Sequence, residues 1–272
     1  MDSQHPNNAL PRVVLICHAK DRIDSLGLSA WLASTMDLVG ILLIRERPLR
    51  NLVKARSEIR RVGLVRFIDV LAFRAYYHLR YARRDAAWAE SEITKLRVLY
   101  SERPWQTEQL LVEDPNDEES KAFLLRLHPD LVIARCKFIL KPDIFEIPAS
   151  GTYVLHPGIC PEYRNAHGCF WALVNRDLAR VGMTLLRVDA GVDTGEVLMQ
   201  TSYSFDERHE SPIVMQYRVV LENLNAITDC LIAAWRGRVE PLSVAHRNSA
   251  TWGQPWFTAY LKWKLAVHAE VR

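Results

Sequence analysis

Short runs of consecutive apolar residues place the tightest limit on the folds open to this chain. Arg12 to Cys17 reads RVVLIC, Leu38 to Ile44 reads LVGILLI, and Leu131 to Ala134 reads LVIA. Each run has the length of a strand and does not alternate with polar residues. Uninterrupted apolar strands are typical of a parallel sheet that is covered by helices on both faces. The sequence therefore predicts an α/β fold with a mostly parallel sheet.

Other segments supply the helices and the remaining strands. Leu26 to Leu32 has the three-to-four spacing of apolar residues that indicates a helix, and so does Leu221 to Leu231 before Gly237. Asn116 and Asp117 precede a third such stretch. Strands are also expected at Gly151 to His156, Gly182 to Val188 and Glu196 to Gln200, with a helix at Phe170 to Val174.

Length and composition set the number of domains. A chain of 272 residues with 49% apolar and 25% charged residues can bury one sizeable core. We expect a disordered start over residues 1–10, one domain over 11–237, and a linker with a C-terminal tail over 238–272. No run has the length and apolar character of a transmembrane helix, and residues 1–8 lack the pattern of a signal peptide. A cytoplasmic protein is the expectation.

The cysteines and the first turn argue against two kinds of site. The five cysteines form no CxxC pair and have no histidine at metal-ligand spacing, so reduced thiols and no metal site are expected. The turn from Cys17 to Asp21 has neither GxGxxG nor the Walker glycines. A dinucleotide or nucleotide phosphate cradled at that turn is therefore not expected.

The net charge of +3 is unevenly distributed along the chain. Arg45 to Arg84 holds twelve Arg or Lys residues against three acids. We expect a long surface helix here, with its apolar stripe packed on the sheet and its arginines in solvent. Binding of an anionic partner, such as a nucleotide-sugar diphosphate, a polyphosphate or a membrane surface, remains an alternative. The apolar stripe consists of Leu64, Ile68, Leu71, Ala75 and Leu79.

The aromatic and basic tail from Trp256 to His268 has a similar ambiguity. It can pack on its own domain, cover a dimer interface or rest on a membrane surface. An oligomer is therefore possible, and no nucleic-acid partner is expected.

Two residues have positions that suit chemistry. His156 ends an apolar strand before Pro157 and Gly158, and open α/β sheets bind ligands at the carboxyl ends of their strands. Asp193 lies in a loop of small residues between two expected strands, where the backbone can approach a ligand closely. A histidine and a carboxylate on neighbouring loops can share a proton. On these grounds alone, a structural, hydrogen-bonding histidine is the better interpretation of His156, and a turn former is an equally good interpretation of Asp193.

Five short blocks resemble the catalytic half of the folate-dependent formyltransferases in order and spacing. They read HPG, PEYR, WAL, GMT and VD through DTG, and they fall between His156 and Gly195. A fainter resemblance reaches back to Pro129, and the likeness as a fold covers about Arg12 to Trp235. It implies a Rossmann-like, mostly parallel sheet of the formyltransferase type with a short C-terminal extension.

The resemblance implies transfer of a formyl group from 10-formyltetrahydrofolate to a primary amine, without a metal. By position, His156 would stabilise the oxyanion and carry a proton, and Asp193 would orient it. The family has an asparagine two residues before the histidine, where this chain has Val154. Asn165 or His167 could supply the missing hydrogen-bond donor, although Asn165 is as well explained as a helix cap.

The resemblance also implies which loops bind folate. The loop after the third strand and the loop that carries the aspartate would form this pocket. Its apolar wall residues are equally well explained as ordinary core. The candidate folate-binding residues are Arg135, Phe138, Ile139, Leu140, Asp189 and Val192.

The class of amine that accepts the formyl group is suggested only by analogy with other members of the family. The first loop does not resemble that of members acting on a ribosyl phosphate, and the chain after Gly237 is too short for the barrel domain of members acting on initiator tRNA. A nucleotide-linked aminosugar remains as the candidate amine. Because of Val154, hydrolysis of the formyl donor, transfer of another acyl group, or binding without catalysis are the alternatives.

Overall fold

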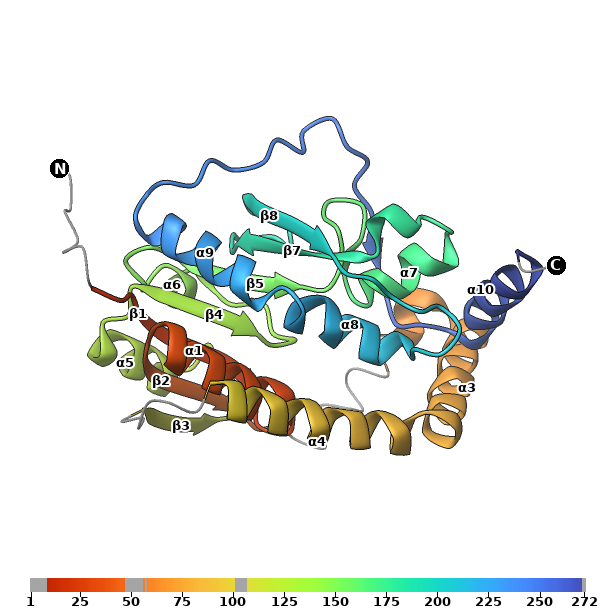
Figure 1. Cartoon of the computed structure of the whole chain (residues 1–272), viewed down its shortest axis with the longest axis horizontal. Coiled ribbons are helices and arrows are strands. Elements are labelled where there is room, and N and C mark those ends of the chain that lie inside the picture. The colour runs from red at the N-terminus through yellow and green to blue at the C-terminus, as the bar shows by residue number, and fades with distance from the viewer. Residues whose placement is uncertain (1–8, 47–55, 57, 101–106, 271–272) are drawn as a thin grey trace.

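A seven-stranded sheet forms the centre of the protein in a computed structural model, which describes residues 9–46, 56, 58–100 and 107–270. The strand order is β3-β2-β1-β4-β5-β7-β8 (Figure 1). All neighbours from β3 to β5 are parallel, whereas β7 and β8 are antiparallel to their neighbours. The expected α/β fold is confirmed. The strands are β1 (Arg12–His18), β2 (Asp37–Ile44), β3 (Glu108–Val112), β4 (Leu131–Arg135), β5 (Thr152–His156), β7 (Gly182–Arg187) and β8 (Val197–Ser202).

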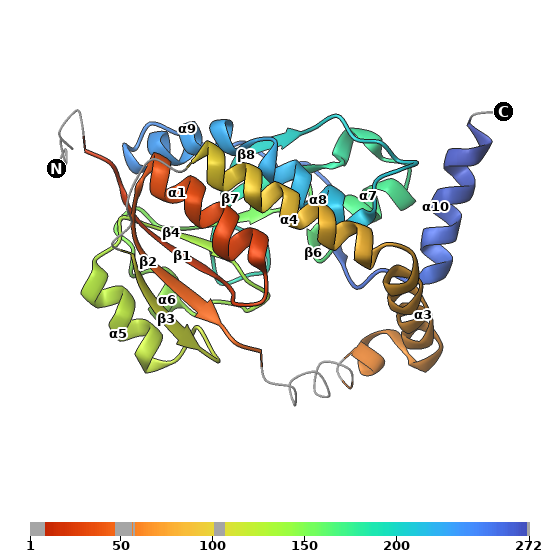
Figure 2. The ribbon, with the colours of Figure 1, turned by 60° about the horizontal axis from the view of Figure 1, so that its bottom comes forward.

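Helices cover both faces of this sheet (Figure 2). Helices α5 (Glu118–Leu127) and α6 (Pro142–Phe145) cover one face. The other face carries η1 (Ile23–Leu28), which is a π-helix, α1 (Ser29–Thr35), α4 (Ala82–Leu99), α7 (Gly168–Val174), α8 (Pro212–Leu221) and α9 (Leu224–Trp235). Helices α3 (Leu64–Arg80) and α10 (Phe257–Ala269) lie beyond the carboxyl edge of the parallel strands, and the short elements η2 (Leu178–Arg180), β6 (Arg164–Asn165) and β9 (Thr251–Trp252) complete the fold.

The unbroken apolar strands are explained by this two-sided cover. Successive side chains of a strand point to opposite faces of the sheet. In β1, Val13 and Leu15 belong to the core under α1 and α7, whereas Val14 and Ile16 belong to the core under α5. Neither face of the sheet is open to water, so polar and apolar residues do not alternate along the strand.

The aromatic tail packs on its own domain. Helix α10 buries Tyr260 and Trp263 in the larger of the two cores, where Trp263 is fully enclosed. Strand β9, in the segment expected to be a linker, pairs in parallel with β6. Of the expected disordered start, residues 1–8 lie outside the described residues, as do residues 47–55 and 57 of the basic segment.

The expected orientation of the basic helix is wrong. The stripe of Leu64, Ile68, Leu71, Ala75 and Leu79 faces solvent, with Leu64 61% and Leu79 90% exposed. The buried residues of α3 are Val70 and Phe73, on the other side of the helix. Phe73, together with the half-buried Tyr76 and Tyr77, packs into the same core as α10. Turned inward, these aromatic rings bury more apolar area than the leucines of the stripe would.

Candidate active site

His156 lies at the carboxyl end of β5, where the sheet changes from parallel to antiparallel pairing. Its side chain is buried, with 4% of the residue exposed. Nε2 lies 2.8 Å from the backbone oxygen of Tyr163. Gly158 is needed beside it, because a Cβ there would lie 2.7 Å from His156 Nε2 and 2.6 Å from Tyr163 O. The HPG turn thus holds the imidazole in one orientation.

Asp193 faces the other nitrogen of the same ring. Its Oδ2 lies 3.4 Å from His156 Nδ1 and accepts a hydrogen bond of 2.7 Å from the backbone N–H of Asn165. The Asp193 backbone has φ 51°, in the left-handed region. Asp189 stabilises this loop by accepting hydrogen bonds from the Thr194 hydroxyl and the Gly191 N–H, at 2.7 Å and 3.0 Å. The expected proximity of His156 and Asp193 is present.

The hydrogen bonds assign the protons on the imidazole. A carbonyl oxygen can only accept, so the proton of neutral His156 is on Nε2 and is donated to Tyr163 O. Nδ1 is then free to accept a proton, and Asp193 Oδ2 is close enough to stabilise the resulting imidazolium. The pair can therefore act as a general base with a carboxylate partner.

Val154 occupies the position two residues before His156, on the same face of β5. Its side chain is half-buried against the core under α5 and lines the cavity beside His156. Valine donates no hydrogen bond. A donor for a developing oxyanion must therefore come from another element.

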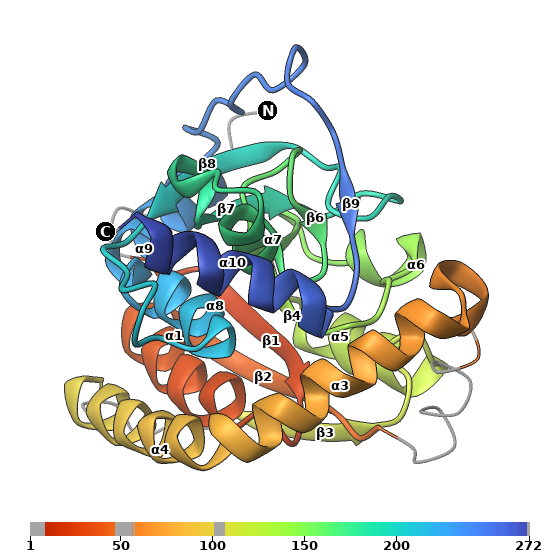
Figure 3. The same ribbon diagram turned by 90° about the vertical axis from the view of Figure 1, so that its right-hand side faces the viewer.

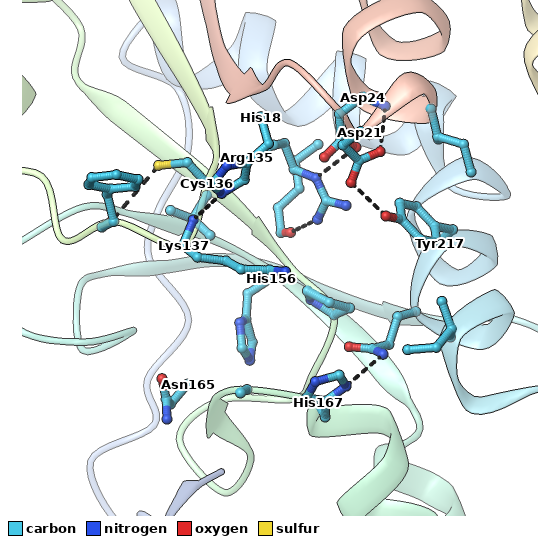
Figure 4. Close-up of a pocket in the computed structure, with 18 of the residues that line it drawn as sticks. His18, Asp21, Asp24, Arg135, Cys136, Lys137, His156, Asn165, His167 and Tyr217 are labelled. Carbon is cyan, nitrogen blue, oxygen red and sulfur yellow. Dashed lines mark hydrogen bonds and ion pairs between the residues drawn. The ribbon is translucent and has the colours of Figure 1, made fainter. Parts of the chain in front are cut away.

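Asn165 and His167 differ in what their side chains can offer. Asn165 Nδ2 donates to Trp252 O at 2.5 Å, which ties the side chain to strand β9. Asn165 does not cap α7, whose N-cap is His167. The ring of His167 lines the same cavity as His156, and its Nδ1 lies 3.0 Å from Gln216 Nε2 (Figure 4). Because the amide nitrogen can only donate, the proton of neutral His167 is on Nε2.

The electrostatic surroundings keep His167 neutral. Burial lowers the pKa of His167 to about 4, with a further lowering by Lys137, and the hydrogen bond that the ring donates to the Gln254 side chain opposes this shift. At neutral pH the ring is thus uncharged and its Nε2–H donates, with the Gln254 side chain as its acceptor in this structure.

The same pKa makes stability depend on pH. The unfolded state, with an ordinary histidine, binds more protons between about pH 6.5 and pH 4, so the free energy of unfolding should fall as pH drops through this window. The His167 contribution is at most about 3 kcal/mol. Urea unfolding at several pH values measures how the free energy of unfolding changes with pH. We expect a smaller change across this window for His167→Phe than for the wild type. The same change of the free energy of unfolding with pH in His167→Phe and in the wild type would contradict the neutral assignment.

A cavity of about 1420 Å³ opens next to the His156–Asp193 pair. All the candidate folate-binding residues line it, although they differ in exposure. Ile139 is 64% exposed, whereas Leu140 is buried in the core under α5. Arg135 Nη1 donates to the Leu155 backbone oxygen at 2.6 Å, which holds this guanidinium behind the strand that ends in His156. The cavity is large enough for two organic substrates.

A polar cluster on the cavity wall had no role in the sequence-based predictions. Arg135 Nε donates to Asp24 Oδ1 at 3.2 Å, and Tyr217 donates its hydroxyl proton to Asp21 Oδ2 at 2.5 Å (Figure 4). Burial raises the pKa of Asp24 to about 7, against the opposite effect of Arg135. The only signal in the sequence was the polar run that follows β1. Among residues 9–46, 56, 58–100 and 107–270, no group of three or more metal-ligating side chains is present.

Residues 98–231 match the family model described as formyl transferase. Curated relatives include the methionyl-tRNA formyltransferases of Pelotomaculum thermopropionicum, 28% identical over 118 residues, and Geobacter metallireducens, 37% identical over 87 residues. These alignments cover 41% and 32% of this chain, and 37% and 28% of the relatives. The chain thus spans less than two fifths of the length of these relatives.

Solved structures share the fold over most of the chain. A phosphoribosylglycinamide formyltransferase from Anaplasma phagocytophilum has a TM-score of 0.53 at 13% identity, covering 90% of this chain and 100% of that one. A sugar N-formyltransferase from a Shewanella species has a TM-score of 0.51 at 16% identity, covering 88% and 76%. At these identities the likeness concerns the fold, and it agrees with the Rossmann-like sheet.

Proposed function

From the match of residues 98–231 to the formyl transferase family, we propose that this protein transfers a formyl group from 10-formyltetrahydrofolate to the primary amine of a small molecule. The observation that carries the proposal is the His156–Asp193 pair on the wall of the large cavity. A buried imidazole with one nitrogen fixed and the other beside a carboxylate is suited to take a proton from an attacking amine.

In the proposed reaction, His156 carries the proton and Asp193 stabilises the charged imidazole. When bound, 10-formyltetrahydrofolate supplies an electrophilic formyl carbon. As the amine nitrogen bonds to this carbon, His156 Nδ1 takes the proton that the amine loses, and Asp193 stabilises the imidazolium. The imidazolium then returns this proton to the leaving nitrogen as the old carbon–nitrogen bond breaks.

His167 is the donor that we assign to the formyl oxygen in place of the missing asparagine. Its Nε2 carries the proton at neutral pH, its ring lines the same cavity as His156, and the formyl oxygen would take the place of the Gln254 side chain as the acceptor of this proton. The Asn165 amide donates to strand β9 instead, and its backbone N–H holds Asp193. A fixed donor aimed at a developing oxyanion typically contributes a factor of about a hundred to a thousand in rate.

The apolar residues beside His156 fit the aromatic rings of a folate. Phe138, Ile139 and Leu140 on one loop and Val188 and Val192 on the other line the cavity. Rings sandwiched by such side chains gain binding energy from the apolar area they bury.

The cavity also has basic side chains that suit an anionic acceptor such as a nucleotide-linked aminosugar. The side chains of Lys20, Arg74 and Lys137 line it, and among the described residues none of the three has a carboxylate within ion-pair distance. Cations of this kind bind phosphate oxygens. The Shewanella relative is a sugar N-formyltransferase, which is consistent with this class of acceptor.

Folate binding is tested by calorimetry with a non-reactive analogue of 10-formyltetrahydrofolate. We expect micromolar binding, and about tenfold weaker binding by Ile139→Asp, because the charged side chain replaces an apolar contact with the rings. The matched control is Leu242→Asp, an exposed leucine that does not line the cavity. No binding at millimolar analogue would contradict the proposal.

Hydrolysis of the formyl donor is the second candidate, and Val154 is the observation that favours it. Without the family's amide at this position, water instead of an amine can be the nucleophile that attacks the formyl group. Release of formate at the same rate with and without an amine would support hydrolysis, whereas absence of both reactions with intact folate binding would support a binding protein.

A further inference from the structure

Helices α3 and α10 expose large apolar side chains, and this surface suggests a function that does not depend on the reaction. On α3, the residues Leu64, Val65, Ile68, Leu71 and Leu79 are all between 44% and 90% exposed. Ile68 and Leu71 follow Leu64 at spacings of four and three residues, Leu79 lies eight residues further on the same side, and Val65 is next to Leu64, so the five form one apolar ridge of about four turns. We call these five residues the α3 ridge.

Helix α10 extends this surface. It packs against α3, and both helices lie at the front of the molecule in Figure 3, on the side away from α5 and α6. Leu261 and Leu265 are the exposed leucines of α10, and Leu265 is 71% exposed. A soluble domain rarely leaves so many large aliphatic side chains exposed on neighbouring helices, so this surface is expected to have a partner.

Basic side chains flank the ridge. Arg80 and Arg83 are exposed at the end of α3 and the start of α4, and Lys262 is exposed on α10. The one acidic residue of α3, Asp69, is already occupied by the backbone N–H of Thr258, by the Thr258 hydroxyl and by Arg66. The uncompensated charge next to the ridge is therefore positive.

The positive charge next to the ridge distinguishes two possible partners of this surface, a second copy of the chain and a membrane. Two copies of the chain meeting through the ridge would bring their arginines together, and like charges across an interface oppose association. An anionic bilayer surface would attract the same arginines while its acyl boundary accepts the leucines. We infer that α3 and α10 bind the surface of membranes that contain anionic lipids.

The geometry is that of peripheral binding. The described residues contain no helix long and apolar enough to cross a membrane. Helix α3 has its aromatic face in the core and its ridge on the opposite side, so it can lie in the interfacial plane without unfolding. The arginines at the flanks can reach the phosphates of the headgroups.

Co-sedimentation of the full chain with vesicles tests this inference. We expect binding to phosphatidylcholine vesicles that contain phosphatidylglycerol, and little binding to phosphatidylcholine alone. The variant Ile68→Ser/Leu71→Ser should bind about tenfold more weakly, because less apolar area enters the bilayer. In the variant Arg80→Gln/Arg83→Gln, the affinity for anionic vesicles should fall about fivefold for each arginine removed.

The matched control is Leu125→Ser, which removes an exposed leucine from α5, a helix on the other face of the sheet. It should bind anionic vesicles like the wild type, and all these variants should bind the folate analogue normally, since none of the substituted residues lines the cavity. Equal binding to neutral vesicles, or no binding to anionic ones, would overturn the inference. So would a lipid-free dimer that Ile68→Ser/Leu71→Ser dissociates, since a second copy would then be the occupant.

Discussion

Replacing His156 by asparagine is expected to lower the rate of formyl transfer about a thousandfold. The His156 imidazole lies on the cavity wall with Nδ1 facing the Asp193 carboxylate, and a positioned general base typically contributes a factor of about a hundred to ten thousand. Steady-state kinetics with a saturating amine would measure the change in kcat.

A merely structural role for His156 would give a different result. His156 also donates to Tyr163 O, so its loss could disturb the HPG turn. Calorimetry with the folate analogue and urea unfolding separate the two effects, because a base that acts only in the reaction leaves binding nearly unchanged. A His156→Asn enzyme that keeps more than about a tenth of the wild-type kcat would contradict the assignment.

Replacing His167 by phenylalanine is expected to lower kcat about a hundredfold or more. The variant keeps a ring on the cavity wall but removes the Nε2–H that we assign to the oxyanion. The second substitution Val154→Asn returns the family's amide two residues before His156. In the His167→Phe background, Val154→Asn should recover most of the lost rate.

The rescue distinguishes a donor from a packing residue. If His167 only fills space, an asparagine on β5 has no means of restoring the rate. Asn165→Ala serves as the comparison, because its amide is bound to β9. We expect a smaller loss there that Val154→Asn does not repair.

Much of the fold was predictable from the chain because burial on two faces leaves a direct record in the sequence. The runs at β1, β2 and β4 are uniformly apolar since each of their residues meets one of the two cores. The His156–Asp193 pair was also predictable, because the HPG turn and the DTG loop carry the resemblance to the family and both lie at one edge of the sheet.

The orientation of α3 was not predictable from periodicity. This helix has apolar residues on two opposite faces, and the sequence does not say which face meets the core. Only the position of α10 determines that the aromatic face turns inward. The contacts of the half-buried Asp21 and the buried Asp24 likewise depend on partners, Tyr217 and Arg135, that are more than a hundred residues away.

The choice between Asn165 and His167 also required the structure. Both follow the PEYR block, and both are polar. The hydrogen bonds that separate them come from Trp252 and Gln216, on elements far along the chain. Sequence spacing holds no record of such contacts.

The most direct measurement of the central claim follows an isotope-labelled formyl group from 10-formyltetrahydrofolate into nucleotide-linked aminosugars, with mass spectrometry of the acceptor. The account predicts a labelled amide on the sugar nitrogen with the wild-type protein and about a thousandfold less with His156→Asn. Labelled formate at the same rate with and without the amine, and no labelled amide, would contradict formyl transfer and support hydrolysis of the donor.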